Sequence, residues 1–315
     1  MPNLIIVPRS KSLKKIICDT DANTKVQKII NEYSRVNDID PVRVRFSIED
    51  EGGDNKKPTR RPLKGDKTLK ANGLGFENTD KYKVYAKDVG PQIGWKTVYF
   101  IEYLGPLAIH ALTYFGIYDA SNVTRTQNVA FILVMMHFLK REAETLFIHT
   151  FSAATMPLTY LFRNCGHYWI FSGVFLALSI YAPQIGYEET WKKYAFHVAD
   201  RTNEELLGYG ALWSLFQLSN FYCHYILRQL RSDGSKEHKI PYGFLFSLVS
   251  FPNYFFESLS WLVFTVMVNN WSAYLFWVIG TATMMNWAKQ KHRKYKKEFG
   301  DRYPKNRKAM FPFVF

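Results

Sequence analysis

Glu102 is the residue whose setting most directly suggests chemistry. It lies in an apolar stretch between Trp95 and Ile109, where a carboxylate costs about 2.5–3.5 kcal/mol to insert into a membrane. Ionisable side chains kept inside such stretches usually mark substrate paths or proton relays. The sequence therefore predicts a multi-span membrane enzyme instead of a passive anchor.

A second candidate group follows Pro252, which cannot donate a backbone hydrogen bond and so favours a break in its helix. Asn253 and Glu257 share one helical face, and Tyr254 lies beside it. Tyrosine next to a carboxylate and an amide is a credible proton-donating site. A tyrosine resting at the lipid headgroup level is the alternative interpretation.

Two further polar clusters lie at helix ends. Asn220, His224 and Arg228 repeat every four residues, which places them in one stripe that could bind a polar ligand or a neighbouring helix. The segment from Lys140 to His149 also contains Arg141 and Glu144, and Lys140 and Glu144 are i,i+4 neighbours. This second cluster is either an ion pair at a helix end or a group facing an internal cavity.

The basic segment after Ala288 contains ten Lys and Arg residues. A basic helix next to a membrane would indicate headgroup contact alone, but the tyrosines and prolines inside this segment predict a folded cap. The net charge of +14 has two compatible explanations, namely positively charged cytosolic loops and an anionic ligand such as a nucleotide or a coenzyme A ester. Nucleic acid is excluded, because the basic residues follow helix ends and form no single stripe.

Several classes of site are missing from the sequence. Three scattered cysteines suit neither a disulfide framework nor a zinc site, and we predict no metal. There is no Gly-rich dinucleotide fingerprint, phosphate-binding loop or His-x-x-Glu-His element. The apolar run at the N-terminus is too short for a signal peptide, so the first long apolar stretch is expected to direct insertion into the membrane.

Residues 1–88 differ from the rest of the chain and predict a small cytosolic α+β domain. Short strands over 4–7 and 16–18, a helix over 24–36 capped by Thr24, and alternating strands over 42–48 and 82–86 suggest a ubiquitin-like β-grasp. Residues 50–67 read as a loop rich in Gly, Lys and Pro.

Residues 89–315 predict a membrane domain. Six apolar stretches near the ~20 residues that a crossing helix needs cover about 95–117, 126–148, 166–186, 207–228, 244–268 and 271–290. The Lys and Arg distribution places both termini in the cytosol. Two glycosylation sequons, at Asn122 and Asn270, lie so near the membrane that we expect neither to be modified.

The order and spacing of several fragments carry a resemblance. Pro252-Asn253-Tyr254-x-x-Glu257, Lys291-His292-Arg293-x-Tyr295, Tyr303-Pro304-x-x-Arg307 and the segment from His224 to Arg231 are similar to the C-terminal domain of the steroid 5α-reductase family. With the fragments around Glu102 and Lys140 and a ubiquitin-like start, the chain resembles the very-long-chain trans-2-enoyl-CoA reductases of fatty acid elongation, a fungal member among them.

The resemblance implies NADPH-dependent reduction of the enoyl-CoA 2,3 double bond in the endoplasmic reticulum, supplying sphingolipid synthesis, with other elongation enzymes as partners. It implies catalytic roles for Tyr254, as proton donor or oxyanion stabiliser, and for Glu102. It also implies a cofactor site made of Asn220, Arg228, Asn253, Glu257, Lys291, His292, Arg293, Tyr295 and Arg307. Lys140, Arg141, Glu144 and His224 are candidates for contact with substrate or phosphate.

Three alternatives remain open from the sequence, and one of them is a methyltransferase of related fold that would use S-adenosylmethionine. A reductase of the same family could act on a steroid enone or a polyprenol, although the ubiquitin-like domain and the Lys140–Glu144 cluster argue against it. A membrane adaptor presenting its β-grasp domain would need neither Glu102 nor Tyr254.

Overall fold

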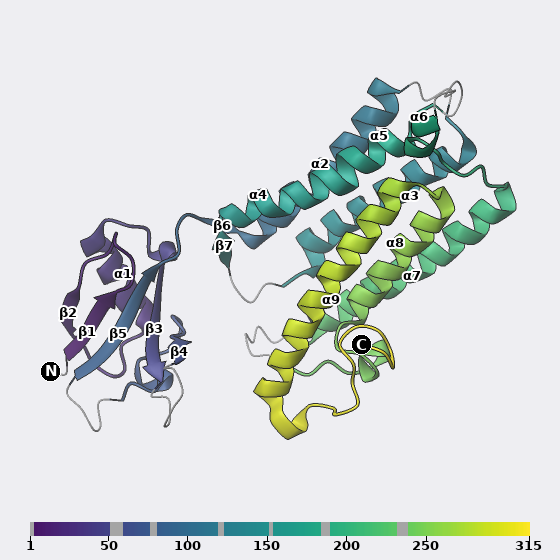
Figure 1. The fold of residues 1–315 in the computed structure, drawn as a ribbon. Coiled ribbons are helices and arrows are strands. Elements are labelled where there is room, and N and C mark those ends of the chain that lie inside the picture. Colours follow the sequence, from purple (N-terminus) through teal and green to yellow (C-terminus); the bar gives the residue numbers. More distant parts are fainter. Residues whose placement is uncertain are drawn as a thin grey trace. The chain divides into compact units, whose positions relative to one another are not determined.

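The computed structural model describes residues 3–50, 59–75, 81–118, 123–150, 154–183, 190–231 and 239–315. The chain divides into two compact units (Figure 1). The first unit contains Met1–Gly94 and Thr155–Tyr160, and the second contains Trp95–Ala154 and Leu161–Phe315. The predicted sequon at Asn122 lies outside the described residues.

The first unit is built on a five-stranded sheet of order β2-β1-β5-β3-β4. Its strands are β1 (Asn3–Pro8), β2 (Ile16–Asp19), β3 (Val44–Asp50), β4 (Thr59–Pro62) and β5 (Lys81–Asp88). The central strands β1 and β5 are parallel, and the other pairs are antiparallel. Helix α1 (Val26–Asn37) buries Val26, Ile29, Ile30 and Tyr33 against this sheet. The 3.6-residue spacing of these side chains predicted that contact.

Three local predictions in this unit were wrong. Helix α1 begins at Val26, and its N-cap is Lys25 in place of Thr24, because the Thr24 carbonyl instead accepts a hydrogen bond from the Leu69 amide. The strand expected from residue 42 starts later, since Pro41–Arg43 form a 3₁₀ turn, η1. Part of the predicted loop is strand β4, which pairs with β3.

Two shorter features complete the first unit. A second 3₁₀ turn, η2, covers Lys70–Asn72. Strands β6 (Gln92–Gly94) and β7 (Thr155–Pro157) form a separate antiparallel pair. The sequence did not predict this pair, because the two strands are short and far apart along the chain.

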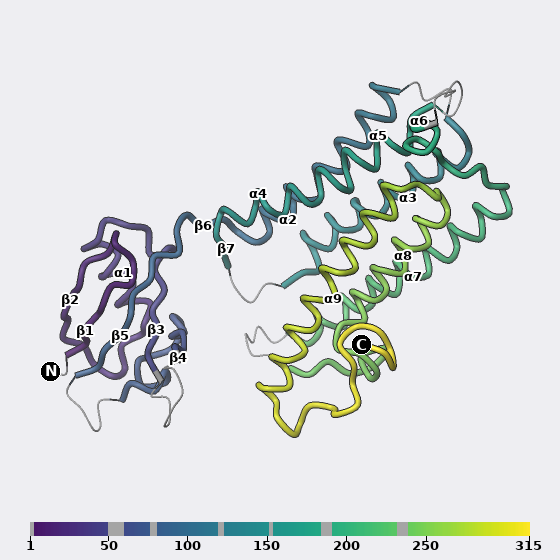
Figure 2. Tube along the Cα trace, in the orientation of Figure 1, coloured from purple at the N-terminus to yellow at the C-terminus, as the bar shows by residue number. Residues whose placement is uncertain are grey.

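The second unit is a bundle of long helices (Figures 1 and 2). Its α-helices are α2 (Trp95–Leu112), α3 (Arg125–Ala143), α4 (Thr159–Cys165, whose first residues belong to the first unit), α5 (Leu176–Ile180), α6 (Thr190–Ala195), α7 (Asn203–Gln229), α8 (Pro252–Val268) and α9 (Trp271–Phe299). Helix α8 packs between α7 and α9, and α2 packs on α3. Their shared core is apolar and rich in aromatic side chains, such as Tyr103, Phe138, Trp261 and Phe264.

Among the residues of the bundle that the structure describes, three stretches are wound as π-helix, with a wider turn than an α-helix. They are η3 (Thr113–Ile117) after α2, η5 (Glu144–Ile148) after α3, and η6 (Gly166–Phe175) between α4 and α5. The 3₁₀ turns η7 (Phe244–Ser247) and η8 (Gly300–Arg302) precede α8 and follow α9.

The helices follow the predicted apolar stretches with three corrections. The stretch expected over 166–186 is helical from Thr159 to Ile180, through α4, η6 and α5. The stretch expected over 244–268 is helical only from Pro252, where the proline occupies the first turn and needs no donor. Helix α9 continues past residue 290 to Phe299. Within the described part of the chain, one helical segment, Trp95–Ile117, is long and apolar enough to cross a membrane by length and composition. The number of six spans stays a prediction.

The segment after α9 folds back onto the bundle, as the tyrosines and prolines predicted. Gly300 turns the chain with a φ of 55°, a conformation that glycine adopts readily. The backbone of Lys308 then pairs with Leu248 and Ser250, and Ala309 and Met310 are buried with Phe251. The returning segment therefore supports the start of α8.

Candidate active site

A cavity of about 470 Å³ lies within the second unit, at the end of the bundle where α3, α7 and α8 bring their polar residues. Its lining includes most of the residues singled out from the sequence: Glu102, Arg141, Asn220, His224, Arg228, Asn253, Tyr254, Glu257, Lys291 and Tyr295. Residues separated by almost two hundred positions thus meet around one space.

The two predicted catalytic residues both line this cavity. Glu102 is 3% exposed, and its Oε2 accepts a hydrogen bond of 3.2 Å from Asn164 Nδ2. The Tyr254 hydroxyl accepts a hydrogen bond of 2.8 Å from Lys291 Nζ. The hydrogen-bonding partner of Tyr254 is therefore a cation, and that of Glu102 is an amide.

The Lys140–Glu144 segment forms a buried charged cluster and is more than an ion pair at a helix end. Glu144 is 1% exposed and pairs with Arg141, with Lys140 Nζ at 3.6 Å and with His224 Nδ1 at 3.0 Å. Arg141 Nη2 also donates to the Tyr103 hydroxyl at 2.9 Å. Of this cluster, Arg141 and His224 reach the cavity lining, while Lys140 and Glu144 hold them from behind.

The polar stripe of α7 connects this cluster to the start of α8. Asn220 accepts a hydrogen bond of 2.6 Å from Lys140 Nζ and donates one of 2.8 Å to the carbonyl oxygen of Asn253. His224 Nε2 lies 3.4 Å from Asn253 Nδ2. The Arg228 guanidinium donates to the Phe147 carbonyl. The spacing of four residues thus predicted the shared face correctly.

Glu257 sits above a buried hydrogen-bonded chain. Its Oε1 lies 3.3 Å from His137 Nε2, and His137 Nδ1 lies 2.9 Å from Gln217 Nε2. Among the described residues, Glu257 Oε2 and Asn253 Oδ1 have no hydrogen-bond partner although both atoms are buried. A buried acceptor without a donor is costly, so these two oxygens suit a ligand that brings N–H or O–H groups into the cavity.

The charge of the lining favours an anionic ligand. Six cationic side chains, Arg141, Arg228, Arg231, Lys239, Lys291 and Lys294, face two carboxylates, Glu102 and Glu257. Arg228 donates to the carbonyl oxygen of Phe147 in η5, and Arg231 donates to that of Thr150, just after η5, at 2.6 Å. Guanidinium and ammonium groups gathered at one cavity are well suited to phosphates.

Three predicted cofactor residues do not line the cavity. His292 Nδ1 is 2.6 Å from the Ser250 hydroxyl, and burial lowers the pKa of His292 to about 4. Arg307 is 2% exposed and lies over the rings of Tyr242 and Tyr303. Arg293 is absent from the lining, because positions 291, 294 and 295 share one face of α9 and position 293 lies outside that face.

Sequence reasoning missed several lining residues, namely Tyr99, Tyr103, Asn164, Tyr168, Arg231 and Lys294. Tyr99 and Tyr103 stack at a ring distance of 5.9 Å, and their i,i+4 spacing beside Glu102 was the available signal. Asn164 and Tyr168 come from α4 and η6, whose apolar surroundings gave no such signal.

Gly105 lets η6 approach the part of α2 that carries Glu102. A Cβ at this position would lie 1.9 Å from Trp169 Nε1, and that indole nitrogen donates to the Ile101 carbonyl at 3.1 Å. Pro106 also leaves the Glu102 carbonyl without its helical donor. The fragment Glu102-Tyr-x-Gly-Pro106 therefore shapes the backbone around the carboxylate.

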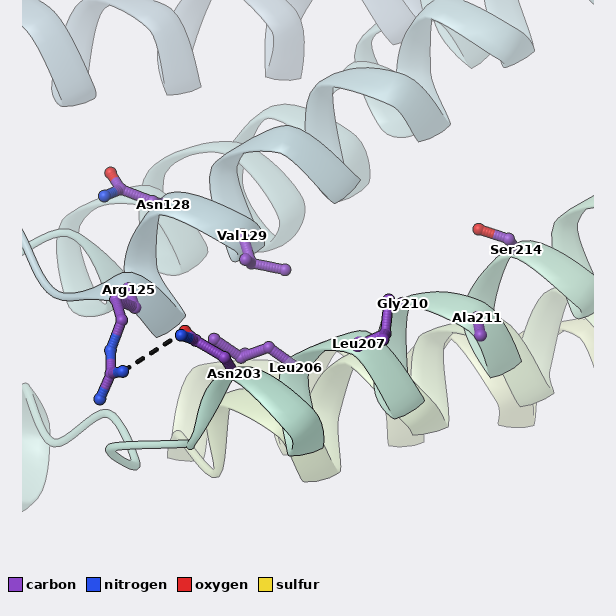
Figure 3. A pocket seen from close by; sticks show the side chains of 9 residues that line it. All are labelled: Arg125, Asn128, Val129, Asn203, Leu206, Leu207, Gly210, Ala211 and Ser214. Atoms are coloured by element: carbon purple, nitrogen blue, oxygen red, sulfur yellow. Dashed lines mark hydrogen bonds between the residues drawn. The ribbon is translucent and has the colours of Figure 1, made fainter.

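A second hollow, of about 650 Å³, lies between the first turns of α3 and α7 (Figure 3). Arg125 Nη1 donates to Asn203 Oδ1 at 3.3 Å there, and Gly210, Ala211 and Ser214 form part of its wall. None of the predicted site residues lines this hollow.

Glu144, His149 and His224 present three potential metal-ligating atoms within 4.8 Å of one another. However, the Arg141 guanidinium pairs with the same carboxylate, and its Nη1 lies 3.4 Å from His224 Nδ1. A guanidinium this close to two of the three residues would repel a divalent ion. The electrostatics of this cluster therefore favour an ion-pair network.

Comparison with known proteins defines the class. Residues 154–315 match the 3-oxo-5-alpha-steroid 4-dehydrogenase family, and the chain belongs to this family of reductases.

Its relatives define a narrower group. The chain is 45% identical over 293 residues to a protein of Schizosaccharomyces pombe described as an enoyl reductase, covering 91% of this chain and 90% of the relative. It is 37% identical over 300 residues to the very-long-chain enoyl-CoA reductase of Dictyostelium discoideum, covering 94% and 93%. A trans-2,3-enoyl-CoA reductase-like protein of Mus musculus is 30% identical over 244 residues, covering 73% and 64%.

Proposed function

We propose that this protein reduces the 2,3 double bond of very-long-chain trans-2-enoyl-CoA with NADPH, the last step of the fatty acid elongation cycle. The observation that carries the proposal is one cavity whose lining combines a tyrosine hydroxyl, a buried carboxylate and several Arg and Lys side chains. The names and extent of similarity of the relatives support the same reaction.

The chemistry of enoyl reduction matches the residues of the cavity. Bound NADPH would supply a hydride to the β-carbon, which leaves an enolate on the thioester oxygen. A hydrogen-bond donor near that oxygen stabilises the developing charge, and a proton must then reach the α-carbon. Two hydroxyls of the described cavity have a cationic hydrogen-bond partner, Tyr254 with Lys291 and Tyr103 with Arg141. Tyr103 is only 2% exposed, whereas Tyr254 is partly exposed, so we assign the proton transfer to Tyr254. We assign Glu102, held by Asn164, to orienting the reacting groups.

The unpartnered oxygens of Glu257 and Asn253 would accept hydrogen bonds from the amide or ribose of the cofactor. Arg228 and Tyr295, together with Arg231, would bind its phosphates and fix its orientation. Asn220 acts by holding the Asn253 backbone. His292 and Arg307 contribute by supporting the returning C-terminal segment and make no direct contact with the cavity.

The location follows from the family and from the apolar helices. We propose an endoplasmic reticulum membrane protein with six spans and both termini in the cytosol, with other elongation enzymes as partners and sphingolipid synthesis as the pathway that uses its product. The order of the five-stranded sheet, with a central parallel pair and one helix, supports a ubiquitin-like β-grasp for residues 1–88.

The test follows NADPH oxidation by the purified protein in detergent with a long trans-2-enoyl-CoA. We expect turnover in the wild type and a loss on the order of 10²–10⁴-fold in Tyr254→Phe, the range that general acid catalysis contributes. Tyr222→Phe is the matched control, because Tyr222 is 49% exposed and does not line the cavity.

The outcomes separate the alternatives. If NADPH is oxidised with a steroid enone or a polyprenol but not with the CoA ester, the protein is still a reductase of this family, but its substrate is not an enoyl-CoA. A folded protein that neither binds NADPH nor turns over any of these substrates would refute the enzyme proposal and favour a membrane adaptor.

A further inference from the structure

Lys291 occupies an unexpected position for a residue that the sequence assigned to the cofactor. Its Nζ donates a 2.8 Å hydrogen bond to the Tyr254 hydroxyl. The same ammonium lies 5.3 Å from the Tyr254 ring centre and 5.8 Å from that of Phe251. The lysine is therefore directed at the tyrosine by both its hydrogen bond and its contact with the rings.

The surrounding structure fixes this geometry. Tyr254 is in the first turn of α8, and its ring stacks on Phe251 at 5.6 Å. Phe251 is also stacked on Tyr295 at 5.8 Å, one helical turn beyond Lys291 on α9. The backbone of Phe251 is bonded to Ala309 of the returning segment. Two helices and the C-terminal segment thus hold the lysine and the tyrosine together.

We propose that Lys291 is a positioning residue for proton transfer by Tyr254, and that phosphate binding is left to the other cations of the cavity. This inference rests on the proposed enoyl-CoA reduction. Because the Tyr254 oxygen accepts the hydrogen bond from Lys291, its own O–H proton is free to point toward a substrate. Tyr254 beside it raises the pKa of Lys291, so the ammonium form is the one present at neutral pH.

The step balances as follows. The enolate electron pair forms the new C–H bond at the α-carbon while the O–H bond of Tyr254 breaks, and the thioester carbonyl is restored. The negative charge passes to the Tyr254 oxygen, where the Lys291 ammonium stabilises it at hydrogen-bond distance. Water then returns a proton to Tyr254. The hydride at the β-carbon comes from the nicotinamide cofactor.

The experiment compares wild type, Lys291→Met, Lys291→Gln and Lys291→Arg at saturating NADPH and enoyl-CoA. It measures kcat, the solvent isotope effect on kcat, the effect of deuterated NADPH, and the NADPH dissociation constant from cofactor fluorescence. Lys289→Met is the matched control, since Lys289 is exposed on the same helix and does not line the cavity.

For Lys291→Met we expect kcat to fall on the order of 10²-fold, with a dissociation constant within about threefold of wild type. The solvent isotope effect should rise and the deuterated-cofactor effect should fall, because proton transfer becomes the slow step. Lys291→Arg should recover most of the activity. Unchanged NADPH affinity shows that a variant is folded. If Lys291→Met does not fold, Lys291→Gln is measured in its place.

Two results would overturn the inference. A weaker NADPH affinity with normal kcat at saturation would make Lys291 a phosphate ligand, and wild-type values throughout would give it no role. In both cases the wild-type enzyme still reduces enoyl-CoA, so the proposed function stands. A wild type that binds NADPH but reduces no enoyl-CoA refutes the proposed function, and the role of Lys291 falls with it.

Discussion

Replacing Gly105 with alanine tests the close approach of α2 and η6 beside Glu102. The new Cβ would lie 1.9 Å from Trp169 Nε1, whereas ordinary contacts begin near 3.4 Å, an overlap of 3.4 − 1.9 = 1.5 Å. The indole must move, and its hydrogen bond to Ile101 is then lost. Trp169 is 39% exposed, so it has room to swing outward.

The expected cost combines three effects. Overpacking costs about 1–3 kcal/mol, and the lost hydrogen bond costs about 1 kcal/mol. The higher helix propensity of alanine stabilises helix α2 by about 1 kcal/mol and offsets part of this cost. We therefore expect a net destabilisation of about 1–3 kcal/mol, which lowers Tm by about 2–12 °C in a domain of this size.

Thermal unfolding in detergent measures this change, and Gly116→Ala is its control. A Cβ on Gly116 would meet nothing within 4 Å, so that variant should be as stable as wild type or slightly more stable. In a Trp169→Ala background, the Gly105→Ala substitution should cost little, because the clashing ring is gone. The reasoning is refuted if Gly105→Ala lowers Tm equally with and without Trp169.

Three further predictions follow from other contacts. Arg228→Ala should raise KM for NADPH about tenfold with little change in kcat, because the proposed phosphate contact, worth about 1.4 kcal/mol, is lost. Steady-state kinetics measures both constants. A large fall in kcat at saturating NADPH would contradict this role. Tyr303→Phe removes the 2.6 Å hydrogen bond to the Ser250 hydroxyl and should lower the unfolding free energy by about 1 kcal/mol in denaturant titrations, whereas an unchanged midpoint would show that this bond does not secure the returning segment. The hydrogen bond from Arg43 holds the pKa of Asp88 below its usual 3.8, so its stabilisation is present above pH 3.8 and is lost as pH falls below that value. Below pH 3.8, amide hydrogen exchange in β5 of the full chain should become faster in wild type, and it should depend less on pH in Asp88→Asn. An identical pH dependence in the two proteins would argue against a stabilising Arg43–Asp88 pair.

Much of the site was accessible from the sequence, because helical spacing alone decides which residues share a face. The 3.6-residue period was enough to predict the stripe of Asn220, His224 and Arg228. Glu102 was conspicuous because of the free energy that a carboxylate costs inside a membrane. The folded C-terminal segment was also predictable, since its tyrosines and prolines do not suit a plain basic helix.

Contacts between helices were beyond such reasoning. The resemblance assigned Lys291 to the cofactor, but only the packing of α9 on α8 brings its ammonium to Tyr254. Likewise, Arg293 looked equivalent to its basic neighbours until the rotation of α9 was known. The chain of His137, Gln217 and Ser260 below Glu257 joins three helices, and no local pattern announces it.

The π-helical stretches bear on which single-residue deletions this chain would tolerate. A π turn contains one residue more than the α turn it replaces, so removing a residue within Gly166–Phe175 could be absorbed by tightening that turn. The same deletion inside α7 would rotate every later side chain by about 100° and carry Asn220 and His224 off the cavity. A single-residue deletion late in η6 is thus expected to be tolerated better than one near the start of α7, the helix that carries Asn220 and His224.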